Sequence, residues 1–144
     1  MRSDYLNENS GKTASYKKKA ELISAARTLA EADSGKVFFL ESSGGAFSIT
    51  LPTASTGIDG VNYKFVVQEE TPTGAITLAA SSAIVSLVMK DAGGNASNST
   101  VGTQVSNIVI GTSAQRADVI DMIFWNGEWY ATALSGIDDA ITTS

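Results

Sequence analysis

The chain contains no histidine and no cysteine, and these two absences exclude much enzyme chemistry. Without these residues there is no Ser-His-Asp or Cys-His nucleophilic system. Zinc, copper, iron–sulfur and haem-iron sites lose their usual protein ligands, and no disulfide can cross-link the fold. Carboxylates, lysines, tyrosines and hydroxyl groups are left for catalysis, so we expect neither an enzyme nor a cofactor or metal site.

Charged residues are also scarce, at 17% of the 144 residues, and they are unevenly distributed. Residues 1–36 hold seven basic and five acidic residues, whereas residues 37–144 hold three basic and ten acidic ones. Such an acidic body disfavours nucleic acid as a partner. No apolar run approaches the roughly 18 residues of a membrane-spanning helix, and the polar N-terminus does not resemble a signal peptide. We therefore expect a protein made inside the cell, without a membrane segment.

The first thirty residues differ in character from the rest of the chain. Residues 1–15 are polar, with Tyr5 and Leu6 as their large apolar residues, which indicates an arm that docks onto another surface. Residues 16–30 carry apolar residues at helical spacing, which predicts one short helix that ends before the turn-forming residues 31–35. The apolar positions of this expected helix are Leu22, Ile23, Ala26, Leu29 and Ala30.

From residue 36 onward, short β-forming runs replace the helical pattern. They are separated by turns every eight to twelve residues, and the longest loop is residues 90–104. This rhythm predicts a mainly β fold, an antiparallel sandwich or barrel of about eight strands. We expect an N-terminal arm and helix over residues 1–30, the β domain over residues 31–136 and a C-terminal tail over residues 137–144.

The sharpest local signal is Asn126-Gly127, because both central residues of a type I′ hairpin turn need a positive φ. A two-residue turn here sets the register of the flanking strands. One face of the hairpin is then apolar, and it pairs Phe124 with Trp129, Met122 with Ala131 and Ile120 with Ala133.

The opposite face of this hairpin is also largely apolar, which a fully solvated face would not be. Two interpretations fit: a sheet covers the hairpin on each side, or one face is a subunit interface. The residues expected at such an oligomer interface are Ile123, Trp125, Tyr130 and Leu134.

Other motifs carry little chemistry. Gly11-Lys12-Thr13 ends like a phosphate-binding loop, but Leu6 stands where that motif needs glycine. The neighbouring carboxylates Glu69-Glu70 and Asp138-Asp139 point to opposite faces of a strand, so surface solubility explains them. The loop at residues 90–104 has oxygen ligands for a cation but lacks EF-hand spacing.

A series of short motifs resembles the small β-domains of tailed-phage structural proteins, especially capsid decoration (cement) proteins. It starts at Ala32-Asp33-Ser34-Gly35-Lys36, continues through Ile49-Thr50-Leu51-Pro52 and Tyr63-Lys64-Phe65, and closes with Asn126-Gly127 and Trp129. Similar motifs occur in tail-fibre domains. The resemblance covers residues 29–134. In the similar domains, the residues that match Arg27-Thr28-Leu29 tend to be extended, whereas the periodicity here predicts helix at these residues. We expect the helix to end near Ala26 or Arg27.

The resemblance implies a structural protein without an active site, which decorates the outer surface of a phage capsid. It implies binding to the major capsid protein by an oligomer, commonly a trimer. The short length, the absence of an internal repeat and of heptads, and the start at Met1 favour a separate decoration subunit over a fibre. The residues expected at the capsid contact, which come from the arm and the lysine run, are Tyr5, Leu6, Tyr16, Lys17, Lys18 and Lys19.

Two other functions stay open from the sequence. The first is a tail or fibre protein that binds a receptor, in which the loops at residues 53–62 and 90–104 would form the recognition surface. The second is a carboxylate-dependent hydrolase acting on glycans, which would need two carboxylates about 5–10 Å apart in a cleft.

Overall fold

The computed structural model describes residues 17–90 and 104–144, and these fold almost entirely into β-strands. Ten strands lie in the described ranges, together with two short 3-10 turns. In chain order they are β1 (Ala20–Ile23), β2 (Arg27–Thr28), η1 (Glu31–Asp33), β3 (Val37–Leu40), β4 (Phe47–Thr50), η2 (Thr56–Ile58), β5 (Asn62–Val67), β6 (Ile76–Lys90), β7 (Val105–Ile110), β8 (Val119–Trp125), β9 (Glu128–Leu134) and β10 (Ile141–Thr143).

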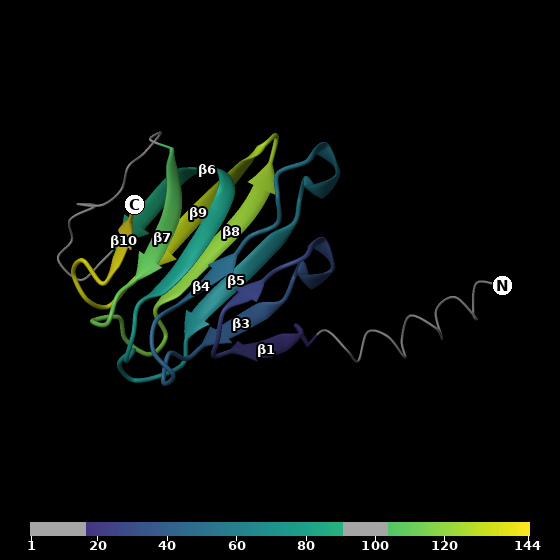
Figure 1. The fold of residues 1–144 in the computed structure, drawn as a ribbon. Coiled ribbons are helices and arrows are strands. Elements are labelled where there is room, and N and C mark those ends of the chain that lie inside the picture. The colour runs from purple at the N-terminus through teal and green to yellow at the C-terminus, as the bar shows by residue number, and fades with distance from the viewer. Residues whose placement is uncertain (1–16, 91–103) are drawn as a thin grey trace, which may run out of the picture.

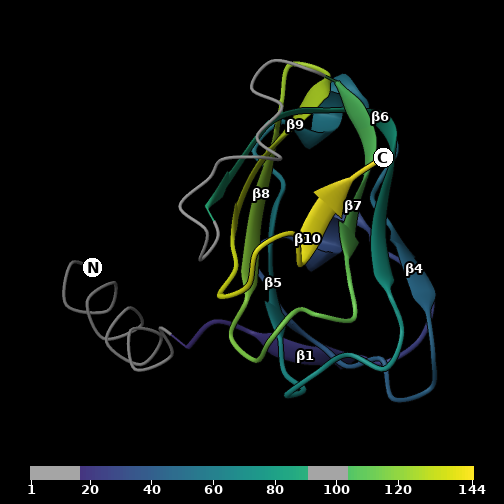
Figure 2. The same ribbon diagram turned by 90° about the vertical axis from the view of Figure 1, so that its left-hand side faces the viewer.

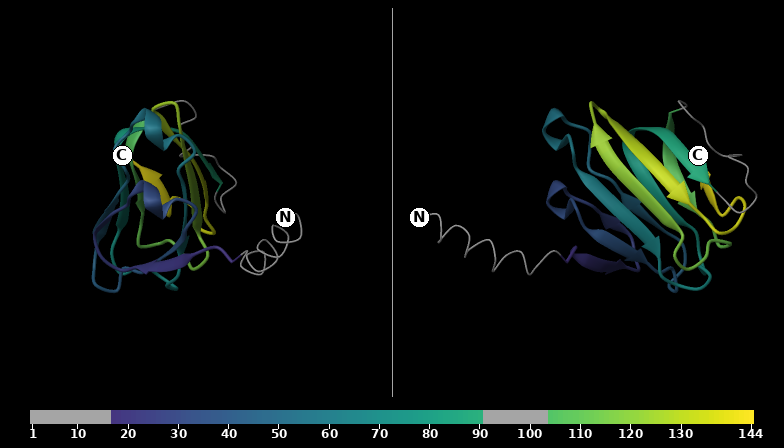
Figure 3. Two further views of the ribbon diagram at one scale, coloured as in Figure 1. Left: turned by 90° about the vertical axis from the view of Figure 1, so that its right-hand side faces the viewer. Right: turned by 180° about the vertical axis from the view of Figure 1, so that it is seen from behind.

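The strands are stacked as two layers with the core between them, as Figures 1 and 2 show. We call the layer β1-β3-β5-β8-β9 the hairpin layer, because it contains the hairpin of β8 and β9. The second layer has the order β2-β4-β6-β7-β10. The edge-on view in the left panel of Figure 3 shows the two layers side by side.

The first half of the fold winds between these layers in a regular way. Strands β1, β3 and β5 lie parallel in the hairpin layer, while β2, β4 and β6 lie parallel in the second layer. Each return to the hairpin layer passes a 3-10 turn followed by a glycine with positive φ, Gly35 after η1 and Gly60 after η2. Glycine tolerates this left-handed conformation, which lets the chain reverse tightly at equivalent positions.

Strand β6 joins the two layers. Its first residues pair with β4 and β7, whereas residues from Ile84 onward pair with β9 in the hairpin layer. The register shifts between Ala79 and Ile84 and again between Val85 and Val88. Such irregularities bend a strand and increase its twist, which allows one strand to belong to both layers.

Aromatic side chains form the centre of the core. Phe38 and Phe65, which are register partners on β3 and β5, stack at 5.7 Å between ring centroids. Tyr63 stacks on Trp129 at 5.7 Å, and Phe124 meets the same indole edge-on at 5.1 Å. All five rings are buried. This cluster links β3 and β5 of the winding half to both strands of the hairpin.

The mainly β expectation is confirmed, but the expectation of an antiparallel fold is wrong in part, because the sheets are mixed. The pairs β1–β3, β3–β5, β2–β4, β4–β6 and β6–β9 are parallel. The alternative of a barrel is also wrong, because the layers do not close on each other: in the described residues, β1 pairs with β3 alone and β2 with β4 alone. Local turn signals do not reveal parallel pairing, because its partners lie far apart in the sequence.

The helix expected over residues 16–30 is wrong for the described residues 17–30, where the chain forms β1 and β2. Ile23 and Leu29 are both buried, but on segments that enter different layers. Their helical spacing is therefore a coincidence of two strands separated by a bend. Long-range pairing with β3 and β4 outweighs the weak local preference.

The hairpin prediction is confirmed, whereas the C-terminal segment forms a strand that we did not expect. The Asn126-Gly127 turn is present, with φ of 50° and 88°, and all three predicted cross-strand pairs of the hairpin are confirmed. Residues 141–143, within the segment that we set apart as a C-terminal tail, form β10 and pair with β7. Ala140 and Ile141 are buried, so this segment contributes to the core.

Candidate interaction surface

The outer face of the hairpin layer carries an apolar row that crosses all five strands. Each residue of this cross-strand row is the register partner of the next. The members half-buried between neighbours are Phe39, Val66 and Val119, whereas the end members are exposed by half. The cross-strand row consists of Leu22, Phe39, Val66, Val119 and Leu134.

A second apolar group lies on the same face, nearer the hairpin turn. This hairpin patch consists of Ile123, Trp125 and Tyr130, with Ile123 and Tyr130 as register partners. Trp125 is 60% exposed, Ile123 47% and Tyr130 38%. Large apolar side chains gathered on one face of a sheet mark an interaction surface more often than scattered ones do.

A polar strip separates the two apolar groups. Lys64 of β5 and Asp121 of β8 are register partners, and their Nζ and Oδ2 atoms are 3.7 Å apart. The strip lies in a depression of about 460 Å³. Its lining includes Lys18, Lys36, Asn62, Lys64, Asp121, Ile123, Tyr130 and Thr132.

The outer face of the second layer is different in chemistry. Most of its outward positions carry hydroxyl side chains, with Thr28 next to Thr50 and Ser48 next to Thr77 across the strands, and Val109 is half-buried beside Thr77. Buried Ile49 and Leu78 alternate with them. The apolar outer face of the hairpin layer is therefore not a general property of these sheets, which makes it the candidate interaction surface.

The residues predicted for an oligomer interface all lie on this surface. Ile123, Trp125 and Tyr130 form the hairpin patch, and Leu134, 53% exposed, ends the cross-strand row. The interpretation in which a sheet covers each side of the hairpin is wrong for the described strands, since these cover only the face of Phe124 and Trp129. The interface itself stays a prediction.

The residues predicted for capsid contact are partly placed. Tyr5, Leu6 and Tyr16 lie outside the described residues, as does most of the loop at residues 90–104. Lys17, Lys18 and Lys19 are exposed just before β1. Lys18 also lines the depression that Ile123 and Tyr130 border. Lys18 thus lies at the same depression as two of the residues predicted for the oligomer interface.

Four charged side chains fasten β1 and β2 to the start of β3. Arg27 of β2 pairs with Glu21 of β1 and with Asp33, whose Oδ1 lies 3.2 Å from Nη2. Lys36 reaches both carboxylates, at 3.0 Å to Glu21 and 2.6 Å to Asp33. The Arg27 guanidinium also lies 5.3 Å from the centroid of the Phe38 ring, which permits a cation–π contact. We call these four side chains the charge cluster.

Hydrogen bonds within the charge cluster shift the protonation of its members. The bonds from Arg27 and then Lys36 hold the pKa of the Glu21 carboxyl below its usual value. The bond from Lys36 does the same for the pKa of Asp33. These bonds in turn raise the pKa of Lys36, with Asp33 as the main cause. The cluster is therefore held in its charged form at neutral pH.

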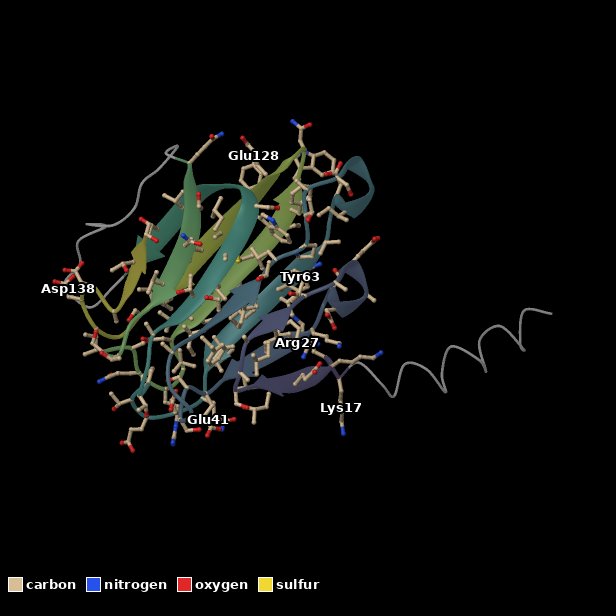
Figure 4. The ribbon with its side chains drawn as sticks, in the orientation of Figure 1. Lys17, Arg27, Glu41, Tyr63, Glu128 and Asp138 are labelled. Atoms are coloured by element: carbon tan, nitrogen blue, oxygen red, sulfur yellow. The ribbon has the colours of Figure 1, made fainter. Side chains whose placement is uncertain are left out.

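Figure 4 shows Arg27 and Lys17 toward the β1 end of the body and Asp138 at the opposite end.

The sequence reasoning missed Leu22, Phe39 and Val66 as members of the surface. Helical spacing places Leu22 in a helix, and the unbroken apolar run Val37-Phe38-Phe39-Leu40 does not show which side chains point outward. The burial pattern resolves this, because Phe38 and Leu40 are fully buried while Val37 and Phe39 are only half-buried. Reading alternate positions from Phe38 would have provided the signal.

In the described part of the chain, no group of three or more acidic side chains is close enough to share a metal ion. No helix among the described residues is long and apolar enough to cross a membrane. No protein-family model matches the chain, and no curated protein matches it.

Proposed function

We propose that this protein is a structural component of a phage virion that decorates and stabilises the outer surface of the capsid. It assembles with its own copies, as a trimer, and binds the major capsid protein. The observation that carries this proposal is the exposed hairpin patch, which lies with the cross-strand row on one face of the protein. The resemblance of residues 29–134 to decoration proteins supplies the identity of the partner.

The hairpin patch contributes apolar area that contacts between copies would remove from water. A tryptophan buries about 150–250 Å² when fully covered, and Trp125 is 60% exposed. Covering this exposed part of the side chain removes roughly 90–150 Å² from water. At about 25 cal/mol per Å², this contributes about 2–4 kcal/mol of binding free energy before the costs of association. Ile123 and Tyr130 add to this on the same face.

The lysine run supports an acidic surface as the second partner. Lys17, Lys18 and Lys19 are exposed and form no ion pair within the described residues. Each copy of an oligomer would bring one such run, so contacts that are weak singly become strong together. Contacts repeated around the capsid would resist the outward pressure of packaged DNA by bridging neighbouring capsid subunits.

The self-association is tested by sedimentation equilibrium of Trp125→Ser and Ile123→Thr against the wild type. We expect a trimer mass for the wild type and a weaker assembly, by about tenfold or more, for each variant. Thr50→Ala, at an exposed position on the outer face of the second layer, is the control and should leave the mass unchanged. A monomeric wild type would contradict the proposal.

The capsid contact is tested with shells that lack the protein. We expect wild-type protein to bind them, and we expect a variant without residues 1–15 to remain an oligomer but to lose shell binding. A triple Lys17→Ala, Lys18→Ala, Lys19→Ala variant should bind more weakly and show a smaller dependence on salt. Unchanged occupancy of the truncated variant would count against the role of the arm.

A tail or fibre location is the second candidate, and one observation favours it. The hairpin turn and the loop at residues 53–62 meet at one end of the body, where Asp59 Oδ1 accepts a hydrogen bond of 2.9 Å from the Asn126 backbone N–H. A depression of about 310 Å³ lies there between Ser55 and Gly127. Loops on a rigid scaffold commonly bind receptors. Imaging of virions labelled at Ser144 separates the two, since label over the head supports decoration and label at the tail tip supports the alternative.

A further inference from the structure

A rigid turn projects Arg116 beside the cross-strand row. The turn is held by the buried Asp118, whose Oδ2 accepts hydrogen bonds from the Gln115 backbone N–H at 2.9 Å and the Ser135 hydroxyl at 2.8 Å. Oδ1 of Asp118 accepts a third bond, of 2.8 Å, from the Gly136 backbone N–H. Three bonds to one buried carboxylate fix the turn to the end of the hairpin.

The backbone inside this turn is strained. Ala117 has a φ of 78°, in the left-handed region that costs a non-glycine residue about 1 kcal/mol or more. Its N–H donates to the Val67 carbonyl at 2.9 Å, so the surrounding contacts maintain the conformation. The hydrogen bonds to Val67 and Asp118 therefore hold the backbone on both sides of the preceding residue, Arg116.

The guanidinium of Arg116 has donors to spare. Its Nε donates to the Gln68 carbonyl at 2.9 Å. Among the described residues it forms no ion pair, and the side chain is exposed. The two Nη groups therefore face solvent with the fork geometry that binds a carboxylate through two bonds.

Depressions open on both sides of Arg116 along the apolar row. One of about 380 Å³ lies between Arg116 and the row members Phe39 and Val66. Another of about 380 Å³ lies between Arg116 and Leu134. Arg116 thus stands between an apolar hollow over Phe39 and Val66 and a mixed hollow that Leu134 and the hydrogen-bonded Asp118 line, and we call this arrangement the Arg116 cleft.

We propose that the Arg116 cleft binds a carboxylate carried next to apolar side chains on an extended segment of a partner protein. The guanidinium takes the carboxylate, and the hollow over Phe39 and Val66 takes the neighbouring apolar side chain. Glu70 lines a third depression against Arg116, separate from this hollow, and its charge disfavours a long polyanion such as nucleic acid. That the partner is the capsid protein rests on the proposed function, whereas the chemistry of the cleft does not.

The ligand chemistry is tested by NMR titration of the full chain with 4-methylpentanoate, an apolar chain that ends in a carboxylate. We expect amide shifts concentrated at Phe39, Val66 and Ala117. The neutral 4-methylpentanamide, of equal shape, should bind at least about tenfold more weakly, because it cannot form the charged fork. Equal binding of acid and amide, or shifts spread evenly over the protein, would overturn the inference.

Variants locate the effect on the guanidinium. Arg116→Gln should lose the preference for the acid over the amide, while Arg116→Lys should keep a reduced preference because its charge remains without the fork. Glu70→Gln is the control on the other side of the arginine, and it should bind the acid as tightly as the wild type or more tightly. An acid preference that persists in Arg116→Gln overturns the proposal.

The partner is tested with shells that lack the protein. Arg116→Gln should occupy fewer sites than the wild type while its own oligomer mass stays unchanged. Equal occupancy by the two proteins overturns the inference. If the wild type does not bind shells, the proposed capsid function fails, and the titration alone then decides the chemistry of the Arg116 cleft.

Discussion

Replacing Asp33 with asparagine tests how the charge cluster holds the first strands. The Asp33 carboxylate accepts hydrogen bonds from Arg27 at 3.2 Å, from Lys36 at 2.6 Å and from the Ala30 backbone N–H at 3.1 Å. The Asp33→Asn variant would keep the shape of the side chain but lose the charge in all three bonds. A bond to a charged group contributes about 1.5–3 kcal/mol when it is buried, and partial solvent screening reduces this. We expect a loss of about 1–2 kcal/mol in the free energy of unfolding at pH 7.

The pH dependence gives the sharper part of this prediction. Hydrogen bonds from the cations lower the folded-state pKa of Asp33 and Glu21, and the unfolded values are about 3.9 and 4.3. A depressed folded pKa contributes stability that is present above the unfolded pKa and is lost as pH falls through the folded one. The difference between wild type and Asp33→Asn should therefore be full above about pH 5 and should shrink below about pH 4.

Urea unfolding followed by tryptophan fluorescence measures this difference, because Trp129 is fully buried and changes environment on unfolding. Protein concentration is held constant, since assembly shifts apparent stability. In thermal unfolding at pH 7, the melting temperature of Asp33→Asn should lie roughly 3–6 °C below that of the wild type. A difference between the two proteins that is the same at pH 7 and pH 3 would refute the electrostatic explanation and leave a purely steric one.

Three further sets of substitutions test single features of the fold by thermal or urea unfolding. Tyr63→Phe removes the hydroxyl that donates to the Ala30 carbonyl at 2.7 Å and should cost about 1 kcal/mol; no loss would show that water replaces the bond. Gly74→Ala would place a Cβ 2.2 Å from the Ala46 backbone nitrogen and should severely reduce the melting temperature. Gly44→Ala meets nothing within 4 Å and should be close to neutral; similar losses for both alanines would contradict the packing argument. Gly127→Ala should cost about 1 kcal/mol, because its φ is 88°, and an unchanged stability would show that the turn can relax.

The sequence contains a strong local code for the hairpin, and this part of the fold was predictable to the residue. Asn126-Gly127 fixes the turn, the turn fixes the register, and the register assigns side chains to the two faces. The same steps place Trp125 and Ile123 on the face opposite Trp129, but they left open whether a second sheet covers that face, and the structure shows both side chains exposed. Here every piece of information lies within one short stretch of chain, from β8 to β9.

The winding half of the fold was not predictable in the same way, because its partners are distant and its repeat is irregular. Gly35 and Gly60 occupy equivalent turns, but the connections around them differ in length and share few residues. Strands of four residues such as β1 leave too short a pattern to distinguish from a helical turn. The extended form of residues 27–28, which the resemblance implied, replaces the predicted helix.

The candidate surface was likewise predictable in its hairpin part and not predictable in the part that the winding half contributes. Its hairpin half follows from local spacing, whereas Phe39 and Leu22 join it only through parallel pairing between strands. Arg116 had no sequence signal at all, since its position depends on a turn that the distant Ser135 and Gly136 hold through Asp118. A glutamate pair read as a solubility feature also has a specific role, because Glu69 accepts a 2.8 Å hydrogen bond from the buried Ser42 hydroxyl.

Strand β6 crosses between the layers, and this couples the unfolding of one layer to that of the other. Ile84 is the register partner of Val105 in the second layer and of Trp129 in the hairpin layer. Neither half of the sandwich can melt while leaving this residue in its native place. The protein should therefore unfold in one cooperative transition with a single melting temperature, without gradual loosening of either layer.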